Sequence, residues 1–153
     1  MKYTKFIIIF LALACLLVWF AVLTVPDDKL HVIACDVGQG DAILIVHKST
    51  QILVDGGPGN SVIDCLSSHI PFYDRDLELV VLTHPQADHY SGLLEVLDDY
   101  RVHAFLGNEL DSSNQSYQVL KNKLDIEGER FFVAIDDKDL ELDLMYLDIL
   151  HPS

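Results

Sequence analysis

The sequence predicts a layered α/β domain that is preceded by one membrane-spanning helix. Three observations support this fold class. Residues 6–25 form an uncharged apolar run, predicted strands come first and then alternate with helices, and ionisable residues directly follow two buried strands. Because the loops that follow the strands of such a domain gather at one edge of the sheet, we expect a functional site at that edge.

The apolar run begins at Phe6 and ends at Val25. An α-helix rises about 1.5 Å per residue, so a helix of this length reaches roughly 30 Å, the thickness of a bilayer's hydrocarbon core. A buried core helix is one alternative, but this run is apolar on every side and lies at the chain end. A cleaved signal peptide is another, but its apolar region is shorter. We therefore expect an uncleaved anchor.

The charges before the anchor predict its orientation. Lys2 and Lys5 precede the apolar run, and positive residues beside a span stay in the cytoplasm. The remainder of the chain would then lie on the outer side. We expect a single-pass protein of the cell membrane, with an anchor in residues 1–25, a linker in residues 26–29 and an extracytoplasmic domain in residues 30–153.

The domain is strongly acidic. The whole chain has a net charge of −14, and without Lys2 and Lys5 the part after residue 25 has a net charge of −16. Such a surface repels phosphate backbones, so the charge gives no support for a nucleic-acid-binding patch.

The three cysteines are Cys15 in the anchor, Cys35 in a strand-like run and Cys65 in a helix-like run. A disulfide between Cys35 and Cys65 is compatible with an extracytoplasmic domain. However, two cysteines make no disulfide framework, and their spacing does not resemble a zinc ribbon or knuckle. Buried free thiols are the state that we expect.

Periodicity and turn residues divide residues 30–153 into strands and helices. Runs of Val, Ile and Leu predict strands, and apolar residues at helical spacing predict helices. Predicted strands cover residues 30–35, 42–47, 51–55, 77–83, 102–106, 130–135 and 144–150, and predicted helices cover about residues 60–69, 91–100 and 113–124.

Two groups of ionisable residues follow predicted buried strands, namely Asp55-Gly56-Gly57 and His84-Pro85-Gln86-Ala87-Asp88-His89. A lone histidine after a strand is more often a surface residue, and a lone aspartate before two glycines is most often a turn former. Together, however, these imidazoles and carboxylates suit zinc, manganese or iron, and a short loop can turn several of them toward one point.

This combination resembles the metallo-β-lactamase superfamily, whose hallmark His-x-His-x-Asp-His follows a strand and is accompanied by an upstream strand ending in Asp-Gly-Gly. Within it, the string Asp-Val-Gly-Gln-Gly-Asp at residues 36–41 is similar to the ComEC-type competence protein branch. The resemblance is close over residues 30–95 and continues loosely to residues 150–152. It covers the amino-terminal half of the family domain.

The resemblance implies an αββα sandwich with a metal site at one edge of its sheets. ComEC members act in DNA uptake, where this domain is regarded as a nuclease on the outer side of the membrane, and related members often hydrolyse phosphodiesters. The implied partners are the membrane through residues 6–25, DNA or another phosphodiester substrate, and another chain that covers the exposed half-sandwich.

The resemblance also implies roles for individual residues. Asp88 and His89 would hold one metal ion, His84 would hold a second, and zinc, manganese or iron would be the ion. Asp55 would orient a ligand through a hydrogen bond, so Asp55 and Asp88 are the expected catalytic residues. Asp41 receives no role.

The sequence departs from the family pattern at two places. Gln86 stands where the hallmark has its second histidine, and a neutral amide is a poor zinc ligand, which weakens the first metal site. The chain also stops at Ser153, before the later family motifs, and His103 and His151 lie in no matching motif. We therefore interpret the chain as a truncated or split domain.

Three functions fit these observations. The first is a membrane-anchored metal-dependent hydrolase that acts on phosphodiesters. The second is a catalytically incomplete remnant that serves as a binding or assembly module, which Gln86 favours. The third is an enzyme of the lactamase or lactonase type, against which the string at residues 36–41 argues.

Overall fold

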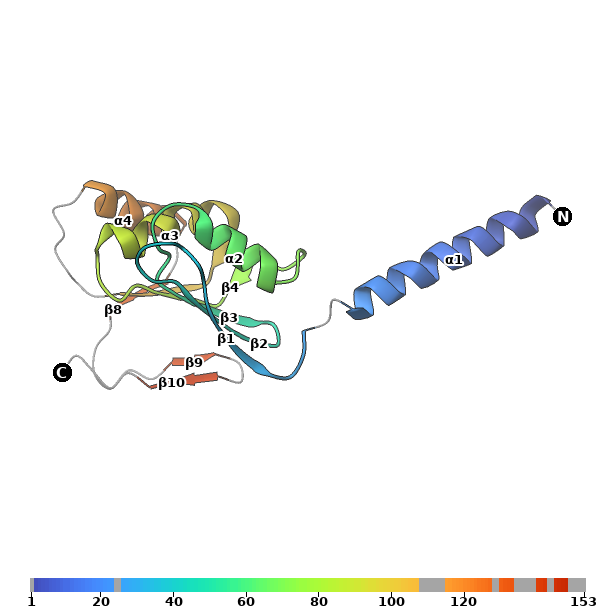
Figure 1. The fold of residues 1–153 in the computed structure, drawn as a ribbon, viewed down its shortest axis with the longest axis horizontal. Coiled ribbons are helices and arrows are strands. Elements are labelled where there is room, and N and C mark those ends of the chain that lie inside the picture. Colours follow the sequence, from blue (N-terminus) through green and yellow to red (C-terminus); the bar gives the residue numbers. More distant parts are fainter. Residues whose placement is uncertain are drawn as a thin grey trace.

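The computed structural model describes residues 2–23, 26–107, 115–127, 130–133, 140–142 and 145–148. Helix α1 (Lys2–Leu23) extends away from the folded domain (Figure 1). Its segment Tyr3–Phe20 is 18 residues long, has a mean hydropathy of 2.3 and is 0% buried within the protein. The helix is thus long and apolar enough to cross a membrane, as the sequence predicts, while the side on which the domain lies stays a prediction.

The domain is built on a six-stranded sheet with strand order β1-β2-β3-β5-β7-β8. The first three strands pair antiparallel, and β3, β5, β7 and β8 pair parallel. The carboxyl ends of the parallel strands therefore meet at one edge of the sheet. The strands are β1 (Leu30–Ala34), β2 (Ile43–His47), β3 (Thr50–Val54), β5 (Leu79–Val81), β7 (Ala104–Gly107) and β8 (Arg130–Val133).

Helices cover one face of this sheet (Figure 1), namely α2 (Ser61–His69), α3 (Ala87–Asp99) and α4 (Gln115–Glu127). The main hydrophobic core lies between them and the sheet. Its fully buried members include Leu44 and Leu53 from the sheet, and Leu66, Leu93 and Leu120 from the three helices. This arrangement confirms the predicted α/β fold class.

The opposite face of the sheet meets a hairpin of β9 (Leu140–Leu142) and β10 (Met145–Leu147). β10 lies within the strand predicted over residues 144–150, whereas β9 was not predicted. Positions 144, 149 and 150 lie outside the described residues. On the same face, Leu30 and Val32 of β1 are 59% and 65% exposed. These apolar side chains agree with the prediction that another chain covers this face, which stays a prediction.

The predicted strand over residues 77–83 is divided in the structure. Residues Asp76–Leu77 form β4, which pairs with β6 (Arg101–Val102) in a separate small sheet, and β5 belongs to the main sheet. Glu78 lies between them, and its carboxylate accepts a hydrogen bond from the backbone N–H of Gln51 at 2.6 Å. The Gln51 carbonyl accepts from the Glu78 backbone N–H at 3.0 Å, so one side of this backbone pair is closed by a side chain and the other by the main chain.

The cysteines correct another prediction. We expected free thiols, but the structure joins Cys35 and Cys65 in a disulfide, with their Cα atoms 5.7 Å apart. Cys35 follows β1 and Cys65 lies in α2, so the sheet and the helix layer that covers it bring together residues 30 positions apart. The sequence could not predict this contact because it depends on how α2 packs. Cys15 in α1 is free and exposed.

Candidate metal centre

Asp55 lies at the centre of the candidate site. It follows β3 directly, is only 2% exposed and has a φ of +56°, a left-handed conformation that few residues other than glycine adopt. Its backbone N–H donates to the carbonyl of Val81 at 2.8 Å, which extends the pairing of β3 with β5. The unusual backbone conformation turns the carboxylate toward the residues that follow β5.

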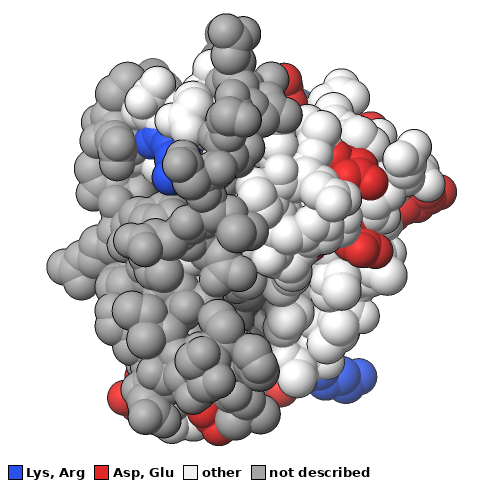
Figure 2. Space-filling model, turned by 90° about the vertical axis from the view of Figure 1, so that its left-hand side faces the viewer, with Lys and Arg blue, Asp and Glu red and all other residues white. Residues whose placement is uncertain are grey.

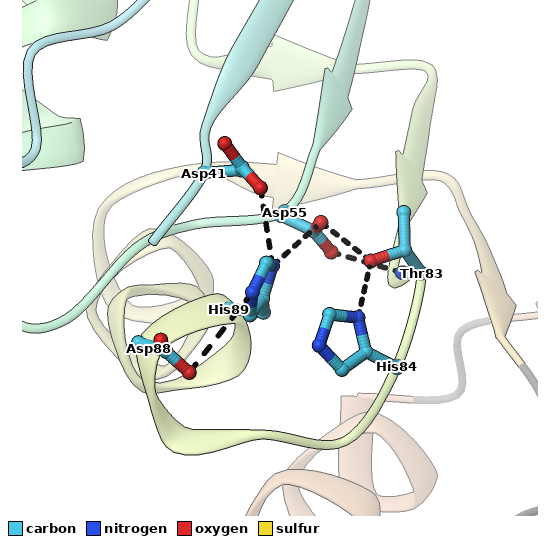
Figure 3. Close-up of polar contacts among 6 residues, drawn as sticks. All are labelled: Asp41, Asp55, Thr83, His84, Asp88 and His89. Atoms are coloured by element: carbon cyan, nitrogen blue, oxygen red, sulfur yellow. Dashed lines mark hydrogen bonds and ion pairs between the residues drawn. The ribbon is translucent and has the colours of Figure 1, made fainter. Parts of the chain in front are cut away.

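The Asp55 carboxylate accepts three hydrogen bonds (Figure 3). Thr83 donates its backbone N–H at 2.9 Å and its hydroxyl at 2.6 Å, and the Nδ1 of His89 lies 3.0 Å away. Since burial of a polar side chain is costly unless its atoms are hydrogen-bonded, these contacts explain why Asp55 is tolerated inside the domain.

Thr83 also connects Asp55 to His84. Its hydroxyl oxygen lies 2.9 Å from the Nδ1 of His84. Because the hydroxyl proton is donated to Asp55, the oxygen must accept from His84, so we assign the His84 proton to Nδ1. The same reasoning assigns the His89 proton to Nδ1, which faces Asp55. In the tautomer that these contacts favour, the lone pair of each neutral imidazole is on Nε2, the atom that would bind a metal.

The first turn of α3 carries Asp88 and His89. We predicted a helix from residue 91 and placed both residues in a loop, but α3 begins at Ala87, after Gln86 in an extended conformation. Packing explains the earlier start. The Gly56 N–H donates to the His89 carbonyl at 2.7 Å, and the Gly92 N–H donates to the Gly57 carbonyl at 2.9 Å, which binds the start of the helix to the loop after β3.

Glycine is required at one of these contacts. A Cβ at position 92 would lie 2.0 Å from the Gly56 carbonyl oxygen, so only a residue without a side chain lets the helix approach this closely. The backbone contacts of Gly56, Gly57 and Gly92 therefore let α3 pack closely against the loop after β3, which places His89 beside Asp55.

The loop at residues 36–41 completes the site from a third direction. Gly40 has a φ of +74°, and a Cβ there would lie 1.9 Å from the backbone oxygen of Asp88. The Asp41 carbonyl accepts from Gly57 N–H at 2.9 Å, and its carboxylate lies 4.0 Å from Nδ1 of His89. We assigned no role to Asp41. Gly38 and Gly40 predicted a tight loop near the site, but the sequence does not show which residue of that loop approaches His89.

The predicted metal ligands lie side by side (Figure 3). The rings of His84 and His89 are 3.9 Å apart between centroids, and Nε2 of His89 lies 4.0 Å from Oδ1 of Asp88. Within the described residues, no group of three or more His, Cys, Asp or Glu side chains is arranged to hold a metal ion. The imidazoles and the carboxylate are nonetheless of the chemical type that binds metal ions. Asp88 and His89 are close enough to act as a pair of ligands.

Gln86 occupies an exposed position at the N-cap of α3. Its backbone carbonyl accepts hydrogen bonds from the backbone N–H groups of His89 and Tyr90 at 2.9 and 3.1 Å, which begin the helix. The residue therefore has a structural role through its main chain. That role is compatible with many side chains, so the structure gives no packing reason for glutamine in place of histidine.

A cavity of about 660 Å³ lies elsewhere, between the linker, the start of β1 and the end of α2. Its lining includes His31, Lys48 and His69 but no residue of the candidate site. The face of the domain turned away from α1 displays scattered acidic side chains (Figure 2). The described residues of that face form no continuous basic patch (Figure 2), in agreement with the net charge.

A family model described as the metallo-beta-lactamase superfamily matches residues 35–143. No curated protein matches the chain. Among solved structures, the metallo-beta-lactamase fold protein YhfI from Bacillus subtilis is similar, with 20% identity, a TM-score of 0.50 and coverage of 74% of this chain and 48% of that one. The Rm3 metallo-beta-lactamase has 16% identity, a TM-score of 0.48 and coverage of 69% and 43%. The chain thus spans about half the length of the solved proteins that it matches.

Proposed function

The chain belongs to the metallo-beta-lactamase superfamily, and on that premise we propose that it is a membrane-anchored, metal-dependent hydrolase that cleaves phosphodiesters. One observation carries the proposal, namely the hydrogen-bonded series from His84 through Thr83 and Asp55 to His89. The series orders two imidazoles for metal binding at the edge of the sheet where the superfamily places its site.

Asp88 and His89 would hold the metal, and His84 would add a ligand or hold a second ion. When bound there, a metal ion would lower the pKa of a coordinated water toward ~7 and so make a hydroxide nucleophile available at neutral pH. Asp55 is buried, and its carboxylate accepts hydrogen bonds from Nδ1 of His89 and from Thr83. Its role is to keep Nδ1 of His89 protonated and the ring oriented, which makes it a positioning residue.

Phosphodiesters are the proposed substrate class because the string at residues 36–41 is similar to the ComEC-type competence branch. The loop that it forms lies against Asp88, so the branch-specific residues and the metal ligands belong to one site. The acidic surface argues for a site that engages phosphate through its metal rather than through a basic groove. A role in DNA uptake is part of the same proposal.

An extracytoplasmic domain is the proposed location. Lys2 and Lys5 before α1 favour this orientation, and the Cys35–Cys65 disulfide supports it independently, because disulfides persist in oxidising compartments and are rare in the cytoplasm.

A binding or assembly module without catalysis is the second candidate. It is favoured by Gln86, whose amide replaces an imidazole ligand, and by the lack of a three-ligand group among the described residues. The two candidates differ in whether the chain retains metal.

Metal stoichiometry tests the proposal. The full chain is purified in detergent without chelator, and zinc, manganese and iron are measured by elemental analysis. About one ion per chain is expected, with loss of most of it in Asp88→Ala/His89→Ala, since a half-site with two protein ligands can retain an ion when solvent completes its coordination. The control is Asp76→Ala/His103→Ala, which removes the contact between Oδ1 of Asp76 in β4 and Nε2 of His103, two atoms that are 2.8 Å apart.

The hydrolase proposal is supported if metal is lost only from the Asp88/His89 variant and if the unmodified chain hydrolyses bis(4-nitrophenyl) phosphate in a metal-dependent way. Equal metal in all three proteins would contradict the ligand assignment. Metal at background in the unmodified chain would leave the binding module as the remaining candidate.

A further inference from the structure

The connection between α2 and β4 presents two aromatic side chains at the tip of a tight turn. The Asp74 N–H donates to the Pro71 carbonyl at 2.8 Å, which closes the turn, and Phe72 and Tyr73 between them are 67% and 55% exposed. Turn tips favour Gly, Asn, Asp and Ser for conformational reasons. Neither the turn geometry nor the core therefore accounts for two exposed aromatic rings at these positions.

The turn lies beside the end of the candidate membrane span. The Phe72 ring is 6.2 Å from the ring of Phe20, which lies near the carboxyl end of α1, and 5.4 Å from the ring of Tyr73 in an edge-on arrangement. In Figure 1 the α2–β4 connection lies on the side of the domain that faces α1. The two aromatic rings are thus at the level where α1 would leave the bilayer.

The turn and the chain's entry point share one edge of the sheet. Asp74 accepts a hydrogen bond from the Gln51 side-chain amide at 3.0 Å, at the beginning of β3. The chain enters the domain at Leu30, which pairs with His47 at the end of β2, close to that same edge. Asp55, in contrast, follows the other end of β3.

β3 separates the two edges by a known length. It has five residues, which span roughly 16 Å in an extended strand. The candidate metal centre and the aromatic turn are therefore at opposite ends of the domain.

We propose that Phe72 and Tyr73 insert into the headgroup region of the bilayer that α1 crosses, as a second membrane contact of the domain. Aromatic rings with an apolar body and a polar edge are the side chains that concentrate at this depth. The contact holds the candidate metal centre away from the lipid, so the site takes its substrate from the aqueous phase and not from the bilayer. This inference rests on the proposed membrane anchor.

The lipid contact is apolar rather than electrostatic. The part of the chain after residue 25 has a net charge of −16, and the two rings are followed by Asp74 and Arg75, whose charges are opposite, so anionic headgroups gain no net attraction from the turn. Vesicles of zwitterionic phosphatidylcholine are the appropriate membrane, and added anionic lipid is expected to give no stronger contact.

Tryptophan fluorescence of the full chain in phosphatidylcholine vesicles tests the inference. Trp19 is the single tryptophan, so Trp19→Phe/Tyr73→Trp carries one reporter at the turn. The control is Trp19→Phe/Tyr146→Trp, which places the reporter at a 65% exposed tyrosine on β10, away from α1 (Figure 1). Each protein is measured with aqueous iodide and with lipids brominated at shallow or deep acyl positions.

The turn reporter is expected to emit at shorter wavelength than the β10 reporter, to be quenched most by shallow bromines and to be several-fold less sensitive to iodide. Strong iodide quenching at the turn without bromine quenching would overturn the inference, as would equal bromine quenching of both reporters. Shallow bromines must also quench Trp19 in the unmodified chain, because Trp19 directly precedes Phe20 at the end of the apolar segment. If they do not, the membrane anchor itself fails, and that result is separate from the metal measurement.

Discussion

Nδ1 of His89 lies 3.0 Å from Oδ2 of Asp55, although the two residues are 34 positions apart, and both side chains are buried. The contact joins the end of β3 to the first turn of α3. It depends on two further features, the left-handed backbone at Asp55 and the close approach of α3 to Gly56. The metal-binding orientation of His89 is therefore a property of the fold and not of the histidine motif alone.

Asp55→Asn is expected to weaken metal binding by about 10- to 100-fold, because an amide cannot accept all three hydrogen bonds that hold His89 and Thr83. One donor is left unpaired in a buried site, which lowers the free energy of unfolding by about 1–3 kcal/mol. Titration with zinc and urea denaturation measure the two effects.

The control for this substitution is Asp76→Asn. Asp76 also accepts from a histidine, His103 at 2.8 Å, but both side chains are much more exposed. It should leave metal affinity unchanged. If Asp55→Asn also left the affinity unchanged, Asp55 would have no positioning role.

Gly40→Ala is expected to disturb the metal centre, whereas Gly38→Ala is not. Both glycines have positive φ, +74° and +80°, so both substitutions incur a backbone cost of about 1–2 kcal/mol. Only at Gly40 would the new Cβ collide with the backbone of Asp88, because no atom lies within 4 Å of a Cβ at Gly38. Metal affinity and thermal stability of the two variants separate the effects. Equal metal affinity would show that the loop does not position Asp88.

Gln86→His is expected to raise metal affinity, because an imidazole replaces an amide that binds zinc poorly. The position is exposed and its known contacts are made by the backbone, so the fold should tolerate the change. The measurement is zinc affinity by competition with a chelator dye, with Gln39→His in the neighbouring loop as the control. An unchanged affinity would mean that the first metal site lacks more than this one ligand.

The disulfide is expected to contribute about 3–4 kcal/mol to stability, since it closes a loop between residues 30 positions apart. In Cys35→Ser/Cys65→Ser the free energy of unfolding should be lower by this amount. A reducing agent should lower the melting temperature of the unmodified chain but not that of the double variant. Cys15→Ser, in the exposed part of α1, is the control. A melting temperature that is insensitive to reduction would argue against the bond.

Much of this fold could be predicted because its strands are short, apolar and separated by clear turn residues. The bounds predicted for β1, β2, β3 and α2 agree with the structure to within one residue at each end. Periodicity cannot reveal where a regular run is interrupted by tertiary contacts. β4 and β5 are divided at Glu78, where β4 pairs with β6 and the Glu78 side chain bonds the Gln51 backbone 27 positions away.

The candidate site shows the same limit. The histidine motif and the Asp-Gly-Gly turn could be singled out, and the structure brings Asp55, His84, Asp88 and His89 together. Thr83 was missed as the residue that connects Asp55 to His84, because a hydroxyl before a histidine carries no signal of its own. The disulfide was missed for the same reason, since neither cysteine indicates its distance from the other.

Glu78 gives the stability of the domain a pH dependence. Burial raises the pKa of its carboxyl above 4.5, and this effect outweighs the hydrogen bond from the Gln51 backbone, which favours the ionised form. The folded state therefore binds the proton more tightly than the unfolded state does. The stabilisation is fully present below pH 4.5 and is lost as the pH rises through the folded-state pKa.

Glu78→Gln removes this titration and preserves the size of the side chain. As the pH rises from below 4.5 to neutral, the unmodified chain is expected to lose stability relative to this variant, as measured by urea denaturation at each pH. Glu95→Gln, at an exposed position on α3, controls for the loss of one negative charge. A difference between Glu78→Gln and the unmodified chain that stays constant across this range would show that the burial of Glu78 does not favour its protonated form.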